Sequence, residues 1–436
     1  MRRFLAISSV LSLVSVVAAA GCSQATDSPQ SEENDFSSDQ ATLLDFEFDG
    51  VLVTDQSWSD KSTITDQLLY TMGHLNADNS VGRLDKVTLT NIVKTAQGGK
   101  TKIAYHAKLP VAWGSKTKLP KKYEFSLPLD TSSVGLETFT TKHKATCTDA
   151  GAHDVDSSSM WYFYRPRLGS CALAPSELTK SSATVTLSTE NSNGKYPEYQ
   201  KVWEDNRLEV VAIFGKYEEG GEAFDAGVDG FNEFIRTMQT QLAPYKAVAT
   251  PALGRTAPGP ETTDITFEGS LPDGKKIKVT ALLVDSITNV WPGFEKRYES
   301  LTLTADVIAY NGHSGLGQNV RALGQMGKWA AKKYQIFFMN GCDSFAYVDG
   351  TLAQQRALLN PDDPTGTKYM EFVTNAMPSF FQSMPNASTA LVRGLLGYAA
   401  PKTYDQIFKE IDRSEVVLVT GEEDNVFAPG MPIGTR

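Results

Sequence analysis

The pattern of hydrophobic and polar positions divides the chain into two parts with different textures. From Ala41 to Asp205 the apolar runs are short, rich in β-branched and aromatic residues, and separated by GG, NG, DG and proline-containing segments. This pattern is typical of β-strands joined by turns, so a β-rich, sandwich-like domain is expected over residues 41–205. The strands expected there are LLDFEFDGVLV, DKVTLTNIVKTA, TKIAYHAKLPVAW, KKYEFSLPL and SATVTLSTE.

After Asn206 strand-like runs alternate with helix-like segments. The clearest helix is Ala226–Leu242, in which apolar residues recur every three to four positions. Such alternation predicts an α/β domain over residues 206–436, with a mostly parallel sheet and helices on both faces. Its other expected elements are a strand LEVVAIFGKYE, a hairpin turning at Pro272-Asp273-Gly274, helices at Phe294–Leu301, Tyr369–Ser383 and Thr403–Asp412, and a last strand EVVLVTGEED.

Two buried strands in this domain each end in a reactive side chain. The first is DVIAYNGHSG (Asp306–Gly315) and the second is YQIFFMNGC (Tyr334–Cys342), with a helix expected over Gln318–Lys333 between them. Strand, helix, strand is a parallel crossover unit, and it brings both strand ends to the same edge of the sheet. His313 and Cys342 are therefore expected side by side, and a histidine beside a thiol is the minimum for a cysteine nucleophile.

The amino terminus has the form of an export signal. Two arginines, an apolar run from Phe4 to Val17 and small residues up to Cys22 predict a signal peptide over residues 1–21. Ala19-Ala20-Gly21-Cys22 resembles the lipobox of bacterial lipoproteins, which implies a lipid on Cys22, a bacterial cell-envelope location and, in a Gram-negative cell, the outer membrane. An ordinary signal peptide cut near Ala20 is the alternative. Residues 22–40 are polar and acidic, so they are expected to form a flexible tether.

Composition and the remaining cysteines narrow the possibilities further. The chain has 436 residues, a net charge of −10 and a pI of about 5.2, which argues against a nucleic-acid partner. Export favours disulfides, and Cys147 and Cys171 are the natural pair, because Cys22 and Cys342 have other roles. A zinc site of His143, Cys147, His153 and Cys171 is the weaker alternative, since its spacing matches no compact pattern. No metal or cofactor is expected.

The two strand-end motifs resemble those of the caspase–legumain–gingipain clan of cysteine peptidases. Its signature is a hydrophobic block ending in His-Gly and a second block ending in a small residue and Cys, here VIAYNGHSG and KKYQIFFMNGCDS. The resemblance implies a caspase-like fold, with Cys342 as nucleophile and His313 as base and general acid. It also implies that the backbone N–H of Cys342, with that of Ser314 or Gly315, binds the oxyanion. The substrate would be a peptide or protein.

Three features depart from the clan, and other functions remain open. The chain has His-Ser-Gly in place of His-Gly, a short spacer between the motifs, and no Asn after the first strand at Phe214-Gly215-Lys216. A non-catalytic surface or periplasmic binding lipoprotein with an inactive caspase-like scaffold is therefore the alternative, and a serine hydrolase built on Gly-His-Ser-Gly is a weaker one. Acidic residues in Lys216–Glu222, Asp343–Ser344 and Glu422–Asp424 indicate a pocket for a basic substrate side chain.

Overall fold

The structure is a computed structural model that describes residues 36–56, 59–150, 152, 155–377, 379–413, 415–421 and 424–434. The expected signal peptide and Cys22 lie outside the described residues, as do His153, Glu422 and Glu423. None of the helices among the described residues has both the length and the apolar character needed to cross a bilayer.

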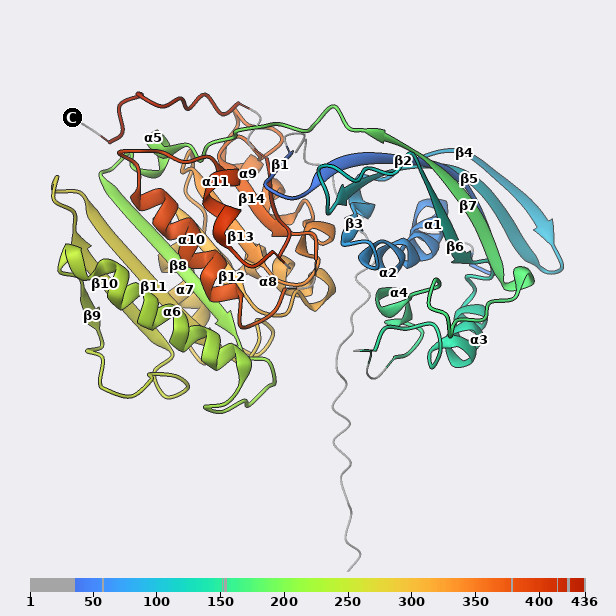
Figure 1. The fold of residues 1–436 in the computed structure, drawn as a ribbon, viewed down its shortest axis with the longest axis horizontal. Helices are drawn as coiled ribbons and strands as arrows, with labels where there is room; N and C mark the ends of the chain where they lie inside the picture. The colour runs from blue at the N-terminus through green and yellow to red at the C-terminus, as the bar shows by residue number, and fades with distance from the viewer. Residues whose placement is uncertain are drawn as a thin grey trace, which may run out of the picture.

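A nine-stranded mixed sheet organises the second part of the chain, which is an α/β domain as the alternating pattern predicts (Figure 1). Five central strands are parallel. On each side of them one strand runs antiparallel, and the edge strand beyond it pairs antiparallel with that strand and so runs in the central direction again. In spatial order the strands are β1 (Phe36–Ser38), β15 (Val417–Thr420), β14 (Met370–Asn375), β13 (Gln335–Asn340), β12 (Val307–Asn311), β8 (Arg207–Gly215), β11 (Lys276–Val284), β10 (Asp264–Ser270) and β9 (Val248–Thr250).

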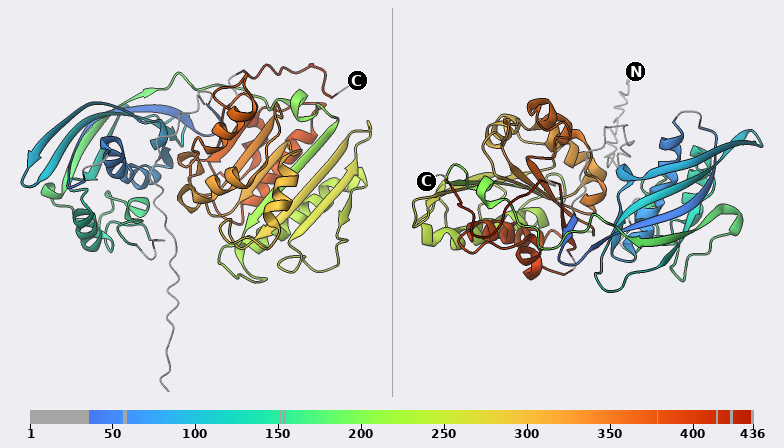
Figure 2. Two further views of the ribbon diagram at one scale, coloured as in Figure 1. Left: turned by 180° about the vertical axis from the view of Figure 1, so that it is seen from behind. Right: turned by 90° about the horizontal axis from the view of Figure 1, so that it is seen from above.

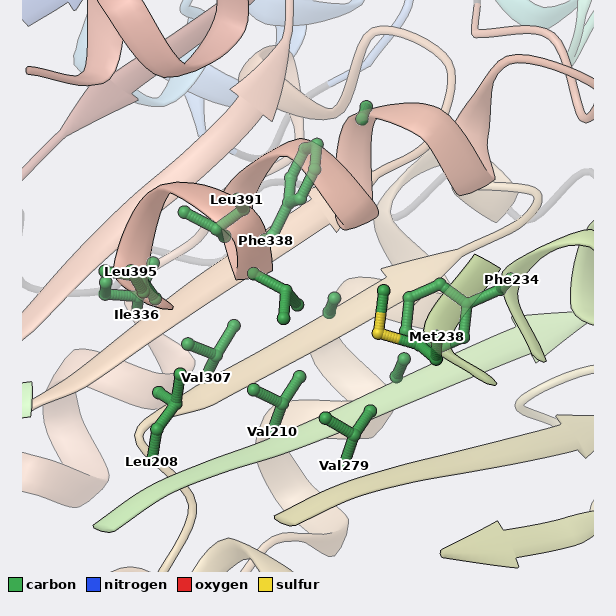
Figure 3. Close-up of a cluster of buried hydrophobic side chains, with 14 of the residues drawn as sticks. Leu208, Val210, Phe234, Met238, Val279, Val307, Ile336, Phe338, Leu391 and Leu395 are labelled. Atoms are coloured by element: carbon green, nitrogen blue, oxygen red, sulfur yellow. The ribbon is translucent and has the colours of Figure 1, made fainter. Parts of the chain in front are cut away.

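Helices cover both faces of this sheet (Figure 2), and side chains alternate between its faces along each strand. On β8, Val210 and Phe214 pack into one hydrophobic core, while Val211 and Ile213 pack into the other. The first core, part of which is drawn in Figure 3, includes α6 (Ala226–Leu242), α10 (Met384–Leu396), α11 (Tyr404–Ile407) and the short α5 (Tyr199–Val202). The second core includes α7 (Phe294–Thr302), α8 (Gln318–Met326) and α9 (Thr351–Leu359).

A six-stranded antiparallel sheet forms the first part of the chain, and all five strands expected there are present. Its strands are β3 (Ser80–Gly82), β5 (Lys100–Trp113), β2 (Thr42–Thr54), β7 (Leu178–Leu187) and β6 (Lys122–Pro128), with β4 (Thr88–Gln97) paired to β5. Helices α1 (Asp60–Leu68), α2 (Tyr70–Asn76), α3 (Ser133–His143) and α4 (Met160–Phe163) share its hydrophobic core. Within the described residues helices pack on this sheet, so the expected sandwich is not confirmed.

The two parts are joined through a shared core. Phe345, Ala376 and Leu418 of the α/β part belong to the same hydrophobic cluster as the strands and helices of the first part. Strand β1 pairs with β15, so Phe36–Ser38 belong to the folded molecule rather than to the tether expected over residues 22–40. Helix α5 packs into the α/β core although it precedes the boundary expected at residue 206.

Two expected helices differ from the structure. The helix expected over Gln318–Lys333 ends at Met326, where the chain turns at Gly327 so that the Trp329 ring can pack against it; a Cβ at residue 327 would lie 2.1 Å from that ring. The helix expected over Tyr369–Ser383 is wrong, because residues 370–375 form the buried strand β14 and the next helix begins at Met384. The intervening loop, residues 376–383, lies at the carboxyl edge of the sheet.

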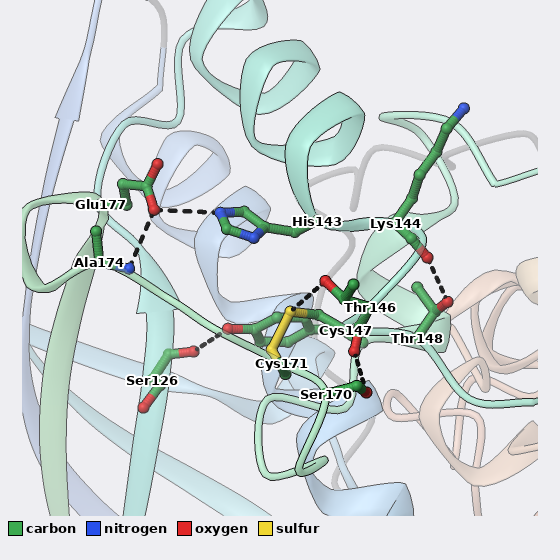
Figure 4. The surroundings of a disulfide bond; sticks show 11 residues. Ser126, His143, Lys144, Thr146, Cys147, Thr148, Ser170, Cys171, Ala174 and Glu177 are labelled. Atoms are coloured by element: carbon green, nitrogen blue, oxygen red, sulfur yellow. Dashed lines mark hydrogen bonds and ion pairs between the residues drawn. A yellow bond between two sulfur atoms is a disulfide. The ribbon is translucent and has the colours of Figure 1, made fainter.

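A disulfide closes the segment that carries α4 (Figure 4). Cys147 and Cys171 are bonded, and Ser170 Oγ donates to Thr146 O at 2.7 Å beside them. The zinc alternative has no support among the described residues, where no group of three or more potential ligands is found. His143, one of its members, lies 3.2 Å from Glu177 Oε2 instead.

Candidate active site

His313 and Cys342 follow matching turns on neighbouring strands. Strands β12 and β13 are parallel and end in register, with Asn311 paired to Asn340. The Gly312 N–H donates to Asn340 O at 3.2 Å, so the first turn bonds directly to the end of the second strand. Because both side chains lie two residues beyond aligned positions, they emerge at the same carboxyl edge of the sheet.

Glycine in each turn lets the two turns approach closely. A Cβ at residue 341 would lie 2.7 Å from Gly312 O and 2.5 Å from Ser314 Oγ, both of which belong to the other turn. A Cβ at residue 312 would lie 2.8 Å from the Tyr310 hydroxyl oxygen. These distances leave no room for a side chain, so both turns require glycine, at residues 312 and 341.

His313 is exposed and oriented by a backbone carbonyl. Its Nε2 lies 3.0 Å from Tyr217 O, and a carbonyl oxygen only accepts, so Nε2 carries the hydrogen. In the neutral ring Nδ1 is then the basic nitrogen. The imidazole also contacts two aromatic rings, that of Tyr217 at a centroid distance of 5.3 Å and that of Phe381 at 4.9 Å. A base held by a third group is the arrangement that nucleophilic catalysis uses.

Two side-chain hydrogen bonds fix the turn after His313, and a backbone N–H in this turn remains available as a donor. The His313 carbonyl accepts from the Tyr310 hydroxyl at 2.8 Å and from Asn319 Nδ2 at 2.5 Å. Among the described residues the N–H groups of Ser314 and Cys342 form no hydrogen bond with an acceptor of another residue. Two such donors at the junction of the turns meet the chemical requirement for binding an oxyanion.

Cys342 is half-buried, and its thiol is neutral at physiological pH. Sγ contacts Ser379 O at 3.6 Å, so Cys342 and His313 each bond a backbone carbonyl rather than each other. Burial of the thiol, with the nearby Asp343 carboxyl as a second cause, raises the pKa of Cys342 to about 11. A thiol of this kind is a poor nucleophile until something lowers that pKa.

Asp343 ties the site to the first part of the molecule. It is fully buried in a left-handed conformation with φ of 50°, and its Oδ2 accepts from Asn76 Nδ2 at 3.1 Å. Burial raises the pKa of this carboxyl to about 7, against the opposing effects of Asn76, the Tyr162 hydroxyl and Arg165. Burial, followed by the charges of Asp343 and Cys342, also raises the pKa of Tyr162. The disulfide-closed segment therefore places the hydroxyl of Tyr162 against both residues.

Several features of the site differ from what the sequence suggests. Asp343 is buried and bonded to Asn76, so it cannot line a pocket for a basic side chain, and Lys216 is paired with Asp285 at 2.7 Å. Tyr162 and Asn76 come from the other sheet's helices, and no sequence motif connects them to Cys342. The contacts made by the carbonyl oxygens of Tyr217 and Ser379 could not be predicted from the sequence either, because every residue has a backbone carbonyl oxygen.

Comparison with known proteins adds no assignment. No family model, no curated protein and no solved structure matches this chain. The largest surface cavity among the described residues lies between α6 and the loop after β9, with Asn232 and Leu253 in its wall, and neither His313 nor Cys342 lines it. The case for function therefore rests on the chemistry of the two turns.

Proposed function

We propose that this chain is an exported, lipid-anchored cysteine peptidase of caspase-like type that hydrolyses peptide bonds with His313 and Cys342, here in a covered resting state. The observation that carries the proposal is the placement of an oriented histidine and a lone thiol on in-register ends of adjacent parallel strands. The carboxyl edge of an open parallel sheet is where α/β proteins bind ligands. The motifs quoted from the sequence support the same type of site.

In the proposed reaction the neutral imidazole activates the neutral thiol. Nδ1 of His313 takes the Sγ proton as the sulfur attacks the peptide carbonyl carbon, and the N–H groups of Cys342 and Ser314 stabilise the oxyanion. The imidazolium then protonates the leaving amine and the peptide C–N bond breaks. The acyl part of the substrate stays bound to Cys342 as a thioester. Water, deprotonated by the same imidazole, hydrolyses the thioester and restores the thiol.

Two observations support a resting state rather than an open site. The pKa of the thiol is about 11, and Tyr162 lies against it. Displacing Tyr162 would hydrate Cys342 and lower its pKa towards that of an ordinary cysteine. The proposed envelope location rests on the sequence of residues 1–22, and the proposed tether would hold the domain near the membrane.

A non-catalytic binding lipoprotein is the second candidate. The observation that favours it is the same raised thiol pKa, because a buried, protonated cysteine is also what an inactive scaffold contains. In that case the antiparallel sheet would carry the binding function.

Hydrolysis of a peptide library by the mature full-length chain separates the two candidates. If His313 and Cys342 act as a unit (the dyad), Cys342→Ala and His313→Ala should each lower kcat/KM by about a thousandfold. The double variant should be little worse than either. His106→Ala is the matched control, since this histidine is partly exposed and pairs with Asp49 on the first sheet. Full activity in Cys342→Ala, or no hydrolysis either by the wild type or by Tyr162→Ala, in which the thiol is uncovered, would overturn the peptidase proposal.

A further inference from the structure

Three asparagine side chains are linked by hydrogen bonds into a row, called the asparagine ladder, at the strand ends that precede His313 and Cys342. Asn311, Asn340 and Asn375 are the last residues of the neighbouring strands β12, β13 and β14, and each is at most 1% exposed. Asn375 Nδ2 donates to Asn340 Oδ1 at 2.7 Å, and Asn340 Nδ2 donates to Asn311 Oδ1 at 3.0 Å. Asn311 Nδ2 points on to Ile213 O at 3.4 Å, so the amides run head to tail across four strands.

Helix α10 is bonded to the same ladder. Asn340 Nδ2 also donates to Met384 O at 3.1 Å, at the start of the helix. Ser388 Oγ, one turn further along, donates to Asn311 Oδ1 at 2.7 Å. These bonds hold both ends of the loop 376–383, because Asn375 precedes the loop and α10 follows it.

That loop contacts both members of the dyad. Ser379 O accepts from the Cys342 thiol, and the Phe381 ring lies against the His313 ring. Met377 O accepts from the Asp343 N–H at 3.1 Å, which fixes the turn that carries Cys342. Asn375 reaches into the loop by donating from Nδ2 to Ser379 Oγ. The ladder is therefore connected to the dyad through the strand ends below and through this loop above.

We infer that the asparagine ladder is a positioning device that sets the separation and orientation of His313 and Cys342. A buried amide group without a partner is costly, so the bonds between the three side chains favour the strand register in which they form. Each active residue follows its ladder asparagine by two positions, so fixing the ladder fixes the origin of both turns. Asn311, Asn340 and Asn375 touch no reacting atom and act through the turns and the loop. The catalytic part of this inference rests on the proposed function.

The test uses an apolar variant of similar size and a matched control. Asn340→Leu removes the central amide, while Asn311 Oδ1 keeps Ser388 and Asn375 Nδ2 keeps Ser379 as partners. Asn360→Leu is the control, because this buried asparagine also loses side-chain hydrogen bonds, those with Lys332 N and Arg356 O, at the opposite edge of the sheet. Ser379→Ala is a milder second variant that breaks the link from Asn375 but keeps the carbonyl that contacts Cys342.

Two readouts are measured on the full-length protein: the pH profile of iodoacetamide labelling at Cys342, and kcat and KM on a cleaved peptide. Asn340→Leu should label at least about fivefold faster, since the loop loosens, and yet lower kcat by roughly tenfold to a hundredfold at nearly constant KM. Ser379→Ala should also raise the labelling rate and lower kcat, by smaller factors. Asn360→Leu should change neither the labelling rate nor kcat.

Equal labelling and equal kcat in the ladder variants and the control would overturn the inference. If Asn340→Leu does not fold, Ser379→Ala decides alone, and wild-type behaviour of that variant would count against the ladder. If neither the wild type nor Tyr162→Ala hydrolyses a peptide, the proposed function fails, but the labelling profile still decides whether the ladder positions the thiol.

Discussion

Asp343 and Cys342 are adjacent acids that oppose each other's ionisation. The carboxyl is buried, and its charge is the second cause, after burial, of the raised pKa of the Cys342 thiol. With a pKa of about 11, only about a thousandth of the thiol is ionised at pH 8, compared with about a quarter for an unperturbed cysteine. The ionisation of the thiol is thus controlled first by burial and then by this neighbouring carboxyl.

Asp343→Asn should make Cys342 more reactive. The amide keeps an acceptor for Asn76 but removes the negative charge, so the thiol pKa should fall by about one unit and labelling at pH 8 should rise about tenfold. Burial remains, so the pKa should stay above that of a free cysteine. The measurement is the pH profile of iodoacetamide labelling, located by peptide mapping. Asp363→Asn is the control, because this buried carboxylate bonds the N–H groups of Gly366 and Lys368 instead. An unchanged profile in Asp343→Asn would remove Asp343 as a cause.

The same substitution should change how stability depends on pH. Asp343 has a pKa of about 7 in the fold and 3.8 as its ordinary value, so the fold favours the protonated form. Its stabilising contribution is complete below about pH 4 and is lost as the pH rises to about 7. The wild type should therefore lose stability over this range relative to Asp343→Asn.

At the scale of single residues, the sequence predicts where the reactive groups stand but not their state. His313 and Cys342 could be placed at one sheet edge because parallel strands end together. The neutral thiol could not be predicted, since it results from burial in the folded molecule, where the contacting Tyr162 is about 180 positions away in the chain. The Asn-Gly pairs before both residues were visible in the sequence, but their role depends on the aligned ends of β12 and β13.

At the scale of elements, strands and helices could be predicted where the pattern of hydrophobic and polar residues reflects burial alone. Helix α6 matches the predicted bounds, and β8 and the β10–β11 hairpin lie where expected. Strand β14 stands where a helix is expected, and it contains the polar residues Glu371 and Asn375. Both are fully buried: Glu371 accepts from the Tyr334 hydroxyl at 2.6 Å, and Asn375 is part of the ladder. Buried polar residues with tertiary partners break the periodicity on which sequence prediction depends.

The disulfide-closed segment is the element that controls access to the thiol. Non-reducing peptide mapping should find Cys147 joined to Cys171, and the double variant to serine should lower the free energy of unfolding by about 3 kcal/mol. Because α4 lies within the closed segment, that variant should also label faster at Cys342. Chemical denaturation and labelling measure the two effects. Free thiols at both positions in the wild type, or a bond from either to Cys342, would contradict this assignment.

At the scale of the whole molecule, the two sheets are coupled at the site itself. Their shared core includes Phe345, three residues after Cys342, and Asn76 bonds Asp343 from the end of α2. The first part of the chain therefore lies against Cys342 and Asp343 of the second. If the peptidase proposal holds, loosening this contact would lower the thiol pKa and admit substrate at the same time.

Two substitutions of Tyr162 test whether its ring, rather than its hydroxyl, restricts access to Cys342. Tyr162→Ala should hydrate Cys342, lower its pKa and raise the labelling rate at pH 8 on the order of tenfold, because reactivity follows exposure and thiolate fraction. Tyr162→Phe keeps the ring and removes only the hydroxyl, which favours the thiolate, so its rate should equal or fall below that of the wild type. If the peptidase proposal holds, hydrolysis should rise in the alanine variant and not in the phenylalanine variant. Equal labelling rates in all three proteins would show that Tyr162 does not restrict access to Cys342, and the cause of the buried thiol would then lie in the loop 376–383.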